Sequence, residues 1–257
     1  MKLYYKDEYI RLFQGDCLEV MDKLIEKGIK FNAIITDPPY GTTQCKWDSV
    51  IPFNDMWERL NKLIIPNGAI VLFGSQPYTS ALIMSQVKLY KYNWVWEKDN
   101  ASNFFAAKFQ PLNNTEDICV FSTGGCNNGT KNPVPYYPQG VKQVEIECVN
   151  GKNVGGLVGQ AHKTAMKEGK KYTQNQTGYP FKILKFKRDA NKSHPTQKPI
   201  ALMEYLINTY TNENELILDF TCGSGSTLIA TKNLKRKCIG IELEEKYCEI
   251  AKSRLIA

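Results

Sequence analysis

The stretch Asp37-Pro38-Pro39-Tyr40 places a carboxylate, two prolines and an aromatic ring directly after the apolar run 31–35. The β-branched residues of that run are typical of a buried strand, and the two prolines force a turn where the strand ends. In open α/β sheets, ligands bind at the carboxyl ends of the strands. We therefore interpret the stretch as a candidate catalytic site. The alternative is a turn in which Asp37 accepts only from local amides.

A glycine-rich turn at 219–226 follows a second apolar run, and Glu242 ends the next expected strand. Small residues let a ligand approach a helix N-terminus, and an acid at that distance can accept from ribose hydroxyls. The dinucleotide fingerprint requires a third glycine where this chain has Leu228, and no phosphate-loop lysine follows Gly225. The turn therefore suits an adenosine ligand without a pyrophosphate, such as S-adenosylmethionine, and disfavours a nicotinamide-dependent oxidoreductase.

The net charge of +7 is unevenly distributed over the 257 residues. Residues 126–193 hold 12 Lys and Arg against 4 Asp and Glu, a balance of +8, and the rest of the chain has a balance of −1. Such a segment suggests a polyanionic partner. A solvated, lysine-rich lobe without a partner is the alternative.

Composition excludes several other classes. No apolar run approaches the ~20 residues of a membrane span, and the first residues are too polar for a signal peptide. The eight cysteines form no C-x-x-C pair, and there are two histidines, so we expect neither a metal site nor a disulfide framework. We expect reduced thiols in a cytoplasmic protein.

The pattern of apolar residues predicts alternating strands and helices. Strands are expected at 9–14, 31–35, 69–73, 92–97, 117–122, 216–220 and 238–241. Helices are expected at 17–27, 53–63, 80–87, 199–210, 227–234 and 244–255, the first capped by Asp16. Loops are expected at 41–47 and 100–114, and a loosely packed insertion at 126–177. The β-α-β-α order of the last third is typical of a doubly wound parallel sheet.

Three motifs together resemble the amino-DNA methyltransferases: D-P-P-Y at 37–40, H-P-T-Q-K-P at 194–199 and D-F-T-C-G-S-G-S at 219–226. Their order, with the catalytic motif first and a basic segment between, resembles the beta class. The resemblance implies a doubly wound, mostly parallel α/β sheet of the Rossmann-like S-adenosylmethionine-dependent methyltransferase type, circularly permuted. It also implies a catalytic half at 1–125, a target-recognition insertion at 126–190 and a cofactor-binding half at 191–257.

The implied activity is site-specific transfer of a methyl group from S-adenosylmethionine to the N6 amino group of adenine in double-stranded DNA, with base flipping. Adenine is favoured because D-P-P-Y, rather than S-P-P-Y, is commoner in N6-adenine than in N4-cytosine enzymes of this family. An N4-cytosine enzyme, another amine methyltransferase and a catalytically silent DNA-binding subunit are the alternatives. The resemblance also leaves open a homodimer and a cognate restriction endonuclease as partners. It implies a cytoplasmic protein that is bacterial, archaeal or phage-encoded.

The resemblance assigns roles to individual residues. Asp37 and the Pro38 carbonyl would accept from the target amine, with Pro39 in the same motif, and Tyr40 would stack on the base. The expected cofactor-binding residues are Asp16, Cys17, Asp37, Thr196, Lys198, Asp219, Phe220, Thr221, Gly223, Gly225, Ser226, Thr227 and Glu242. Expected DNA contacts, from the basic segment, are Lys170, Lys171, Tyr172, Lys185, Lys187 and Arg188. Trp47 and Phe104 would flank the base pocket or fill the core, and His194 has no catalytic role.

Overall fold

A computed structural model describes residues 1–42, 48–149, 169, 171–189 and 197–257. The chain divides into a larger compact unit, Met1–Tyr137 with Lys182–Ala257, and a smaller one, Pro138–Phe181. Each is described by itself below. Within the described residues, no helix is long and apolar enough to cross a membrane.

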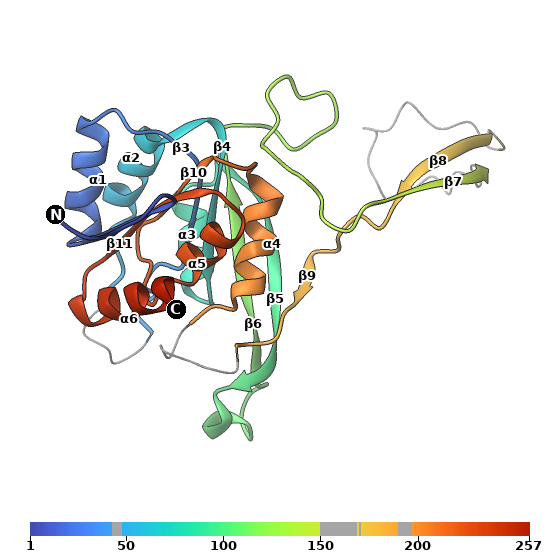
Figure 1. The fold of residues 1–257 in the computed structure, drawn as a ribbon. Coiled ribbons are helices and arrows are strands. Elements are labelled where there is room, and N and C mark those ends of the chain that lie inside the picture. Colours follow the sequence, from blue (N-terminus) through green and yellow to red (C-terminus); the bar gives the residue numbers. More distant parts are fainter. Residues whose placement is uncertain (43–47, 150–168, 170, 190–196) are drawn as a thin grey trace. The chain divides into compact units, whose positions relative to one another are not determined.

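The larger unit contains a nine-stranded sheet of the order β1-β2-β11-β10-β3-β4-β6-β5-β9 (Figure 1). The strands from β2 to β4 in this order pair in parallel, β1 is antiparallel to β2, and β6 is antiparallel to both β4 and β5. The strand bounds are β1 Lys2–Lys6, β2 Ile10–Gln14, β3 Phe31–Thr36, β4 Ile64–Gly74, β5 Tyr90–Ser102, β6 Asn113–Phe121, β9 Ile183–Lys185, β10 Leu216–Asp219 and β11 Lys237–Glu242.

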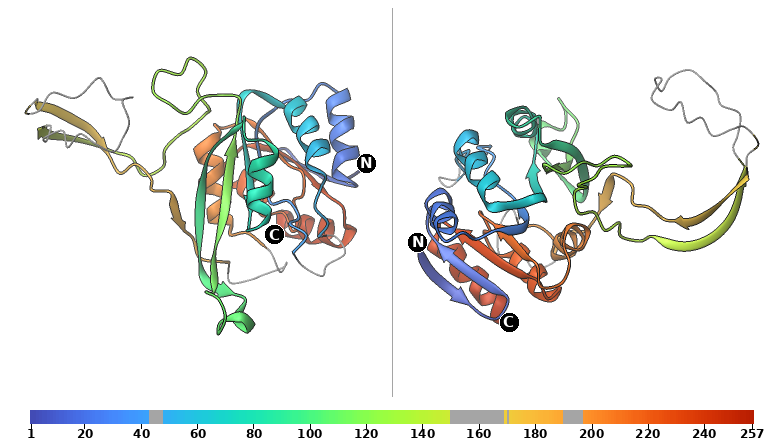
Figure 2. Two further views of the ribbon diagram at one scale, coloured as in Figure 1. Left: turned by 180° about the vertical axis from the view of Figure 1, so that it is seen from behind. Right: turned by 90° about the horizontal axis from the view of Figure 1, so that it is seen from above.

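Helices cover both faces of this sheet (Figures 1 and 2). Residues of α1, α2 and α3 pack with one face, and residues of α4, α5 and α6 pack with the other. The helix bounds are α1 Cys17–Glu26, α2 Phe53–Leu63, α3 Tyr78–Ser85, α4 Ile200–Tyr210, α5 Ser226–Asn233 and α6 Glu245–Ile256. The central strands are buried on both faces, which explains their unbroken apolar runs. The predicted α/β fold is confirmed.

The topology creates a crevice between β3 and β10. These strands are parallel neighbours although they lie far apart in the chain. From β3 the chain continues through α2 to β4 on one side, and from β10 it continues through α5 to β11 on the other. The strand order reverses at this point, which is where ligands bind in open α/β sheets.

Local structure follows the sequence closely in most elements. Asp16 caps α1 as predicted: its Oδ1 accepts from the backbone amides of Leu18 and Glu19 at 2.9 and 3.1 Å. Helix α3 begins earlier than expected, directly after Pro77, because Tyr78 and Leu82 are one turn apart and both buried. The polar edge strand β1 was not predicted.

The β5–β6 hairpin is longer than the sequence predicted. Its ladder extends to the pair of Ser102 and Asn113, so the predicted loop at 100–114 shrinks to residues 103–112, which include a short 3-10 turn. Trp94 and Trp96 are buried on one face of β5, and backbone pairing with β6 continues beyond them. Phe104 is 63% exposed, so the expectation of a core residue there is wrong.

The smaller unit contains an antiparallel pair, β7 Lys142–Val149 with β8 Lys171–Thr177. It holds six of the twelve basic residues of the segment 126–193. It is shorter than the insertion 126–190 expected from the family resemblance, because residues 126–137 and 182–189 belong to the larger unit. Strand β9 joins the main sheet there, in parallel with β5.

Candidate active site

A cavity of about 930 Å³ lies in the larger unit, at the carboxyl ends of β3, β10 and β11. Its lining includes fourteen of the predicted catalytic and cofactor-binding residues: Asp16, Cys17, Asp37, Pro38, Pro39, Tyr40, Lys198, Asp219, Phe220, Thr221, Gly223, Ser226, Thr227 and Glu242. Thr196 and Trp47 lie outside the described residues. Asp37 and Lys198, which are 161 positions apart in the chain, therefore meet at one site.

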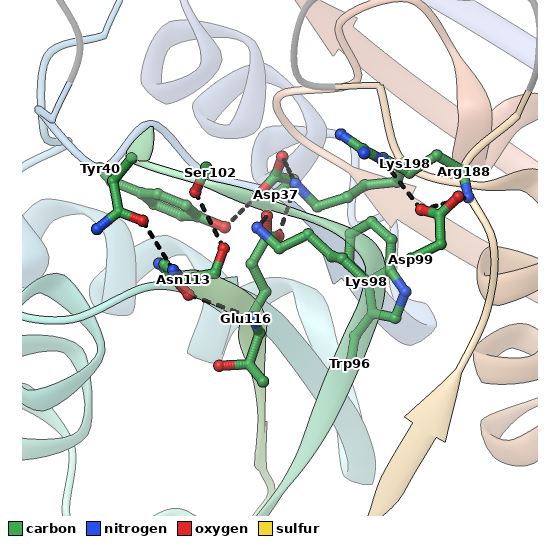
Figure 3. A network of polar contacts seen from close by, with 12 residues as sticks. Asp37, Tyr40, Trp96, Lys98, Asp99, Ser102, Asn113, Glu116, Arg188 and Lys198 are labelled. Atoms are coloured by element: carbon green, nitrogen blue, oxygen red, sulfur yellow. Dashed lines mark hydrogen bonds and ion pairs between the residues drawn. The ribbon is translucent and has the colours of Figure 1, made fainter. Parts of the chain in front are cut away.

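Asp37 occupies the end of β3, where the prolines turn the chain. Its Oδ1 accepts from the Tyr40 hydroxyl, and its Oδ2 pairs with the Lys198 ammonium (Figure 3). The Tyr40 ring lies 5.0 Å from the ring of Tyr78, tilted by 33°. Burial raises the pKa of the Asp37 carboxyl, and the Lys198 ammonium opposes that rise. The carboxylate and the aromatic ring are thus held in one orientation toward the cavity.

Lys198 also contacts a second acid. Its Nζ lies 3.2 Å from Glu116 Oε2 on β6, and Glu116 Oε1 accepts from Lys98 of β5 at 2.9 Å. Charges therefore alternate along Asp37, Lys198, Glu116 and Lys98 (Figure 3). Burial opposes the charge on Lys198, but the two acids outweigh it and raise its pKa to about 12. Lys198 is consequently a cation over the whole physiological pH range.

Glu242 ends β11 at the other end of the cavity. Its Oε2 accepts from the Gly223 amide at 2.9 Å, and its Oε1 accepts from the Glu244 amide at 2.8 Å. Burial raises the pKa of this carboxyl, and the two backbone amides oppose the rise. A carboxylate held by main-chain donors is a fixed acceptor for hydroxyl groups.

Asp219 lies between these two ends, at the end of β10. Its Oδ1 accepts from the Thr36 hydroxyl and from the Thr221 amide, the latter at 3.2 Å. The Thr221 hydroxyl donates to the Asp37 carbonyl at 3.0 Å and so joins β10 to the turn at 37–40. Burial raises the pKa of Asp219 to about 6.

The glycine-rich turn has the shape that an adenosine ligand needs. Gly225 has a φ of +81° and begins α5, and a Cβ there would meet Ala251 at 3.0 Å. Gly223 has a φ of +52°, and nothing lies within 4 Å of where its Cβ would be. The open space beside Gly223, next to the Glu242 carboxylate, fits the sugar of S-adenosylmethionine. Gly225 shapes the turn, although it does not itself line the cavity.

The predicted DNA contacts fall in both units. Lys171 and Tyr172 lie on β8 of the smaller unit. In the larger unit, Lys185 is exposed on β9 and pairs with Glu97 at 3.1 Å. Arg188 lines the cavity and pairs with Asp99 at 3.1 Å. Lys187 is exposed, and Lys170 lies outside the described residues.

The sequence interpretation missed Lys98, Glu116 and Asp48. Lys98 shares a strand face with Trp94 and Trp96, and Glu116 shares one with Ile118 and Val120, so period-two alternation could have placed both acid and base beside the core. Asp48 accepts from the amides of Gly41 and Thr42 at 2.9 and 3.0 Å and so holds the segment after Tyr40. Phe104 lies outside the cavity lining.

Known proteins share both the sequence pattern and the fold. The model of the N6/N4 DNA methylase family matches residues 31–253. The Type II methyltransferase M2.LlaDCHI of Lactococcus lactis subsp. cremoris is 29% identical over 99% of this chain and 92% of its own. M2.DpnII of Streptococcus pneumoniae is 27% identical over 100% of this chain and 93% of its own.

Solved structures agree. The complex of M1.HpyAVI with SAM aligns with a TM-score of 0.62 at 26% identity, over 96% of this chain and 100% of that one. The PvuII cytosine-N4-specific DNA methyltransferase aligns with a TM-score of 0.66 at 15% identity, over 100% of this chain and 89% of that one, and shows the fold alone. With the family model spanning both the D-P-P-Y turn and the glycine-rich turn, the chain belongs to the N6/N4 family of S-adenosylmethionine-dependent DNA methylases.

Proposed function

We propose that the protein methylates the N6 amino group of adenine within a specific sequence of double-stranded DNA. The observation that carries the proposal is the position of the Asp37 carboxylate. It faces the same cavity as the glycine-rich turn, and the Thr221 hydroxyl of that turn donates to the Asp37 backbone carbonyl at 3.0 Å. A target amine at Asp37 and a methyl donor at the glycine-rich turn would then share one enclosed space.

The exocyclic amine of adenine is a weak nucleophile because its lone pair is delocalised into the ring. Asp37 and the Pro38 carbonyl accept from its two N–H groups and so draw the nitrogen toward a tetrahedral form with a free lone pair. Proline suits this role because its φ is fixed and it brings no competing donor. Tyr40, held by Asp37 and Tyr78, stacks on the base.

S-adenosylmethionine supplies, when bound, a methyl group already activated by its sulfonium. The chain contributes binding and orientation. Glu242 accepts from the ribose hydroxyls, the Gly223 turn admits the sugar, and Asp16 and Cys17 line the adenine end. Holding the amine in line with the methyl group supplies much of the rate. A base inside a duplex cannot reach this cavity, so it is flipped out.

The adenine assignment depends on the aspartate at the first motif position. A carboxylate accepts more strongly than the serine hydroxyl of S-P-P-Y, and D-P-P-Y resembles the N6-adenine enzymes. An N4-cytosine enzyme would use the same acceptors and the same cofactor site. The test is sequencing of genomic DNA, with modified bases detected, from methylation-deficient cells that express the protein or its Asp37→Asn variant. N6-methyladenine at one sequence, in the wild type alone, supports the proposal; N4-methylcytosine contradicts it.

We also propose that residues 126–190 hold the DNA and set the methylated sequence. Lys171 and Tyr172 on β8, and Lys185 and Lys187 near β9, are exposed and suited to phosphate contact or base stacking. Exchanging the segment for that of a relative with a different target should change the methylated sequence. Retention of the original sequence would place specificity elsewhere.

The names of the relatives support a partner in the cell. M2.LlaDCHI and M2.DpnII are Type II methyltransferases, which supports a role beside a restriction endonuclease that cuts the same sequence. A homodimer stays a prediction, and light scattering of the purified protein tests it.

A further inference from the structure

One ammonium group is shared by two acids at the catalytic turn. Lys198 Nζ pairs with Asp37 Oδ2 and lies 3.2 Å from Glu116 Oε2 (Figure 3). The Lys198 side chain is only 8% exposed, so its charge cannot be transferred to water without moving the chain. The ammonium therefore has two neighbouring carboxylates with which it can form an ion pair.

Glu116 is positioned to pair with the Lys198 ammonium. Its side chain is 15% exposed, and Lys98 fixes its Oε1 at 2.9 Å. Its Oε2 is buried and makes no hydrogen bond, although the Lys198 ammonium lies within ion-pair distance. Lys98 and Lys198 together hold the pKa of Glu116 below its ordinary value against the effect of burial. Glu116 is thus an ionised carboxylate, and its Oε2, which makes no hydrogen bond, faces the Lys198 ammonium.

The proposed reaction creates a need for such an acceptor. Asp37 accepts from Tyr40 on Oδ1 and from Lys198 on Oδ2, so an incoming amine has to share this carboxylate with a full positive charge. A buried ammonium that loses its partner without gaining another is strongly destabilised. If the ammonium shifts from Asp37 to Glu116, it stays paired while Asp37 becomes available.

We propose that Glu116 is a positioning residue that takes over the Lys198 ammonium when the target amine donates to Asp37. The inference rests on the proposed role of Asp37 as the amine acceptor. The three groups belong to different elements, with Asp37 after β3, Glu116 on β6 and Lys198 before α4. Because Lys198 Nζ already lies 3.2 Å from Glu116 Oε2, a small rotation of the lysine side chain is enough to exchange its partner, and no strand has to move.

The test compares Glu116→Gln, which keeps the shape and removes the charge, with Glu116→Asp, which keeps the charge and shortens the side chain. Asp117→Asn is the matched control. It removes a carboxylate at the next position of β6, where Asp117 accepts from Asn93 at 3.0 Å. Methyl transfer to DNA gives kcat and KM, calorimetry gives the affinity for S-adenosylmethionine, and circular dichroism shows that each variant is folded.

We expect Glu116→Gln to lower kcat roughly tenfold or more, the cost of leaving the displaced ammonium without a charged acceptor, with cofactor affinity unchanged. Glu116→Asp should retain more activity than Glu116→Gln, and Asp117→Asn should match the wild type. If only the shape of the side chain mattered, Glu116→Gln would retain more activity than Glu116→Asp, and that order would overturn the proposal.

A double variant separates charge transfer from simple loosening of the hairpin. With Lys198→Gln there is no ammonium to receive, so adding Glu116→Gln should lower kcat by less than about twofold further. If the two losses multiply, Glu116 does not act through Lys198 and the inference fails. If the wild type transfers no methyl group to DNA, the proposed function fails instead. A wild type that methylates DNA no faster than its Glu116→Gln variant contradicts the inference alone.

Discussion

Two carboxylates at the same edge of the sheet are held in opposite ways. Glu242, after β11, accepts from two backbone amides, those of Gly223 and Glu244, at 2.9 and 2.8 Å. Asp37, after β3, is held by two side chains, the Tyr40 hydroxyl and the Lys198 ammonium. Main-chain donors cannot leave without unfolding the turn that carries them, whereas side chains can rotate about single bonds.

This difference matches the two tasks of the site. The cofactor is the same small molecule in every cycle, so a rigid, preformed acceptor binds it without paying to order the turn. The target base comes from DNA and has to enter the cavity, so its acceptor is held by groups that can be exchanged. The comparison therefore predicts that variants of Asp37 affect chemistry and variants of Glu242 affect binding.

The largest effect is expected from Asp37→Ala. It removes an acceptor for the target amine, and loss of one preorganised group in a reacting site lowers kcat by about 10²–10³ or more. Affinity for S-adenosylmethionine should stay close to that of the wild type, because we propose that Asp37 faces the amine rather than the ribose. Calorimetry with the cofactor is the check. A loss of affinity comparable to that of a Glu242 variant would end the division of labour.

The next effect is expected from Glu242→Gln. The amide keeps one acceptor oxygen but loses the charge, so binding of the cofactor should weaken by about 1.5–3 kcal/mol. Transfer at saturating cofactor should remain near the wild-type rate. Equilibrium dialysis gives the affinity, and unchanged binding would mean that Glu242 only supports the turn to α6. Glu244→Gln is a matched control, because Glu244 contributes its backbone amide rather than its side chain to this contact.

Asp219 sharpens the comparison, since burial raises its pKa from 3.8 to about 6. Between these values the folded chain holds more protons than the unfolded chain, so this group's contribution to stability is present below pH 4 and is lost as the pH rises through about 6. Between pH 4 and pH 8, Asp219→Asn should therefore gain stability relative to the wild type, by up to about 3 kcal/mol. Urea unfolding at pH 8 and pH 4 is the measurement. An equal difference at both pH values would contradict the assignment.

The smallest effect is expected outside both ends of the cavity, at Lys171 of β8. Replacing it with Gln should weaken binding to all DNA alike and flatten the log–log salt dependence by roughly 0.9. Lys62, exposed on α2 and paired with Glu58, provides the control substitution. A change in the methylated sequence rather than in the salt slope would show that Lys171 reads bases.

The sequence predicted the cofactor end of the site better than the target end. Asp219, Gly223 and Glu242 lie on or directly beside elements whose period and turn chemistry are local, so their positions follow from nearby residues. The partners of Asp37 are not local. Lys198 and Glu116 are 161 and 79 positions away, and their meeting depends on β6 lying antiparallel beside β4.

The same reason explains the errors in the fold. The edge strand β1 is polar, and its pairing with β2 is stabilised by backbone hydrogen bonds that no apolar period reports. The β5–β6 hairpin extends past its apolar residues because each strand supplies the other's hydrogen bonds as far as Ser102 and Asn113. Pairing between strands thus set the extent of these elements, which the apolar periodicity of the sequence could not predict.

The central claim is that this site places the methyl group on adenine N6 through Asp37. The most direct measurement uses S-adenosylmethionine labelled in the methyl group, duplex DNA containing the methylated sequence, and separation of the nucleosides after digestion. We predict label in N6-methyldeoxyadenosine with the wild type, and none with Asp37→Ala, although that variant should still bind the cofactor. Label in N4-methylcytosine, or undiminished labelling by the Asp37 variant, would contradict the account.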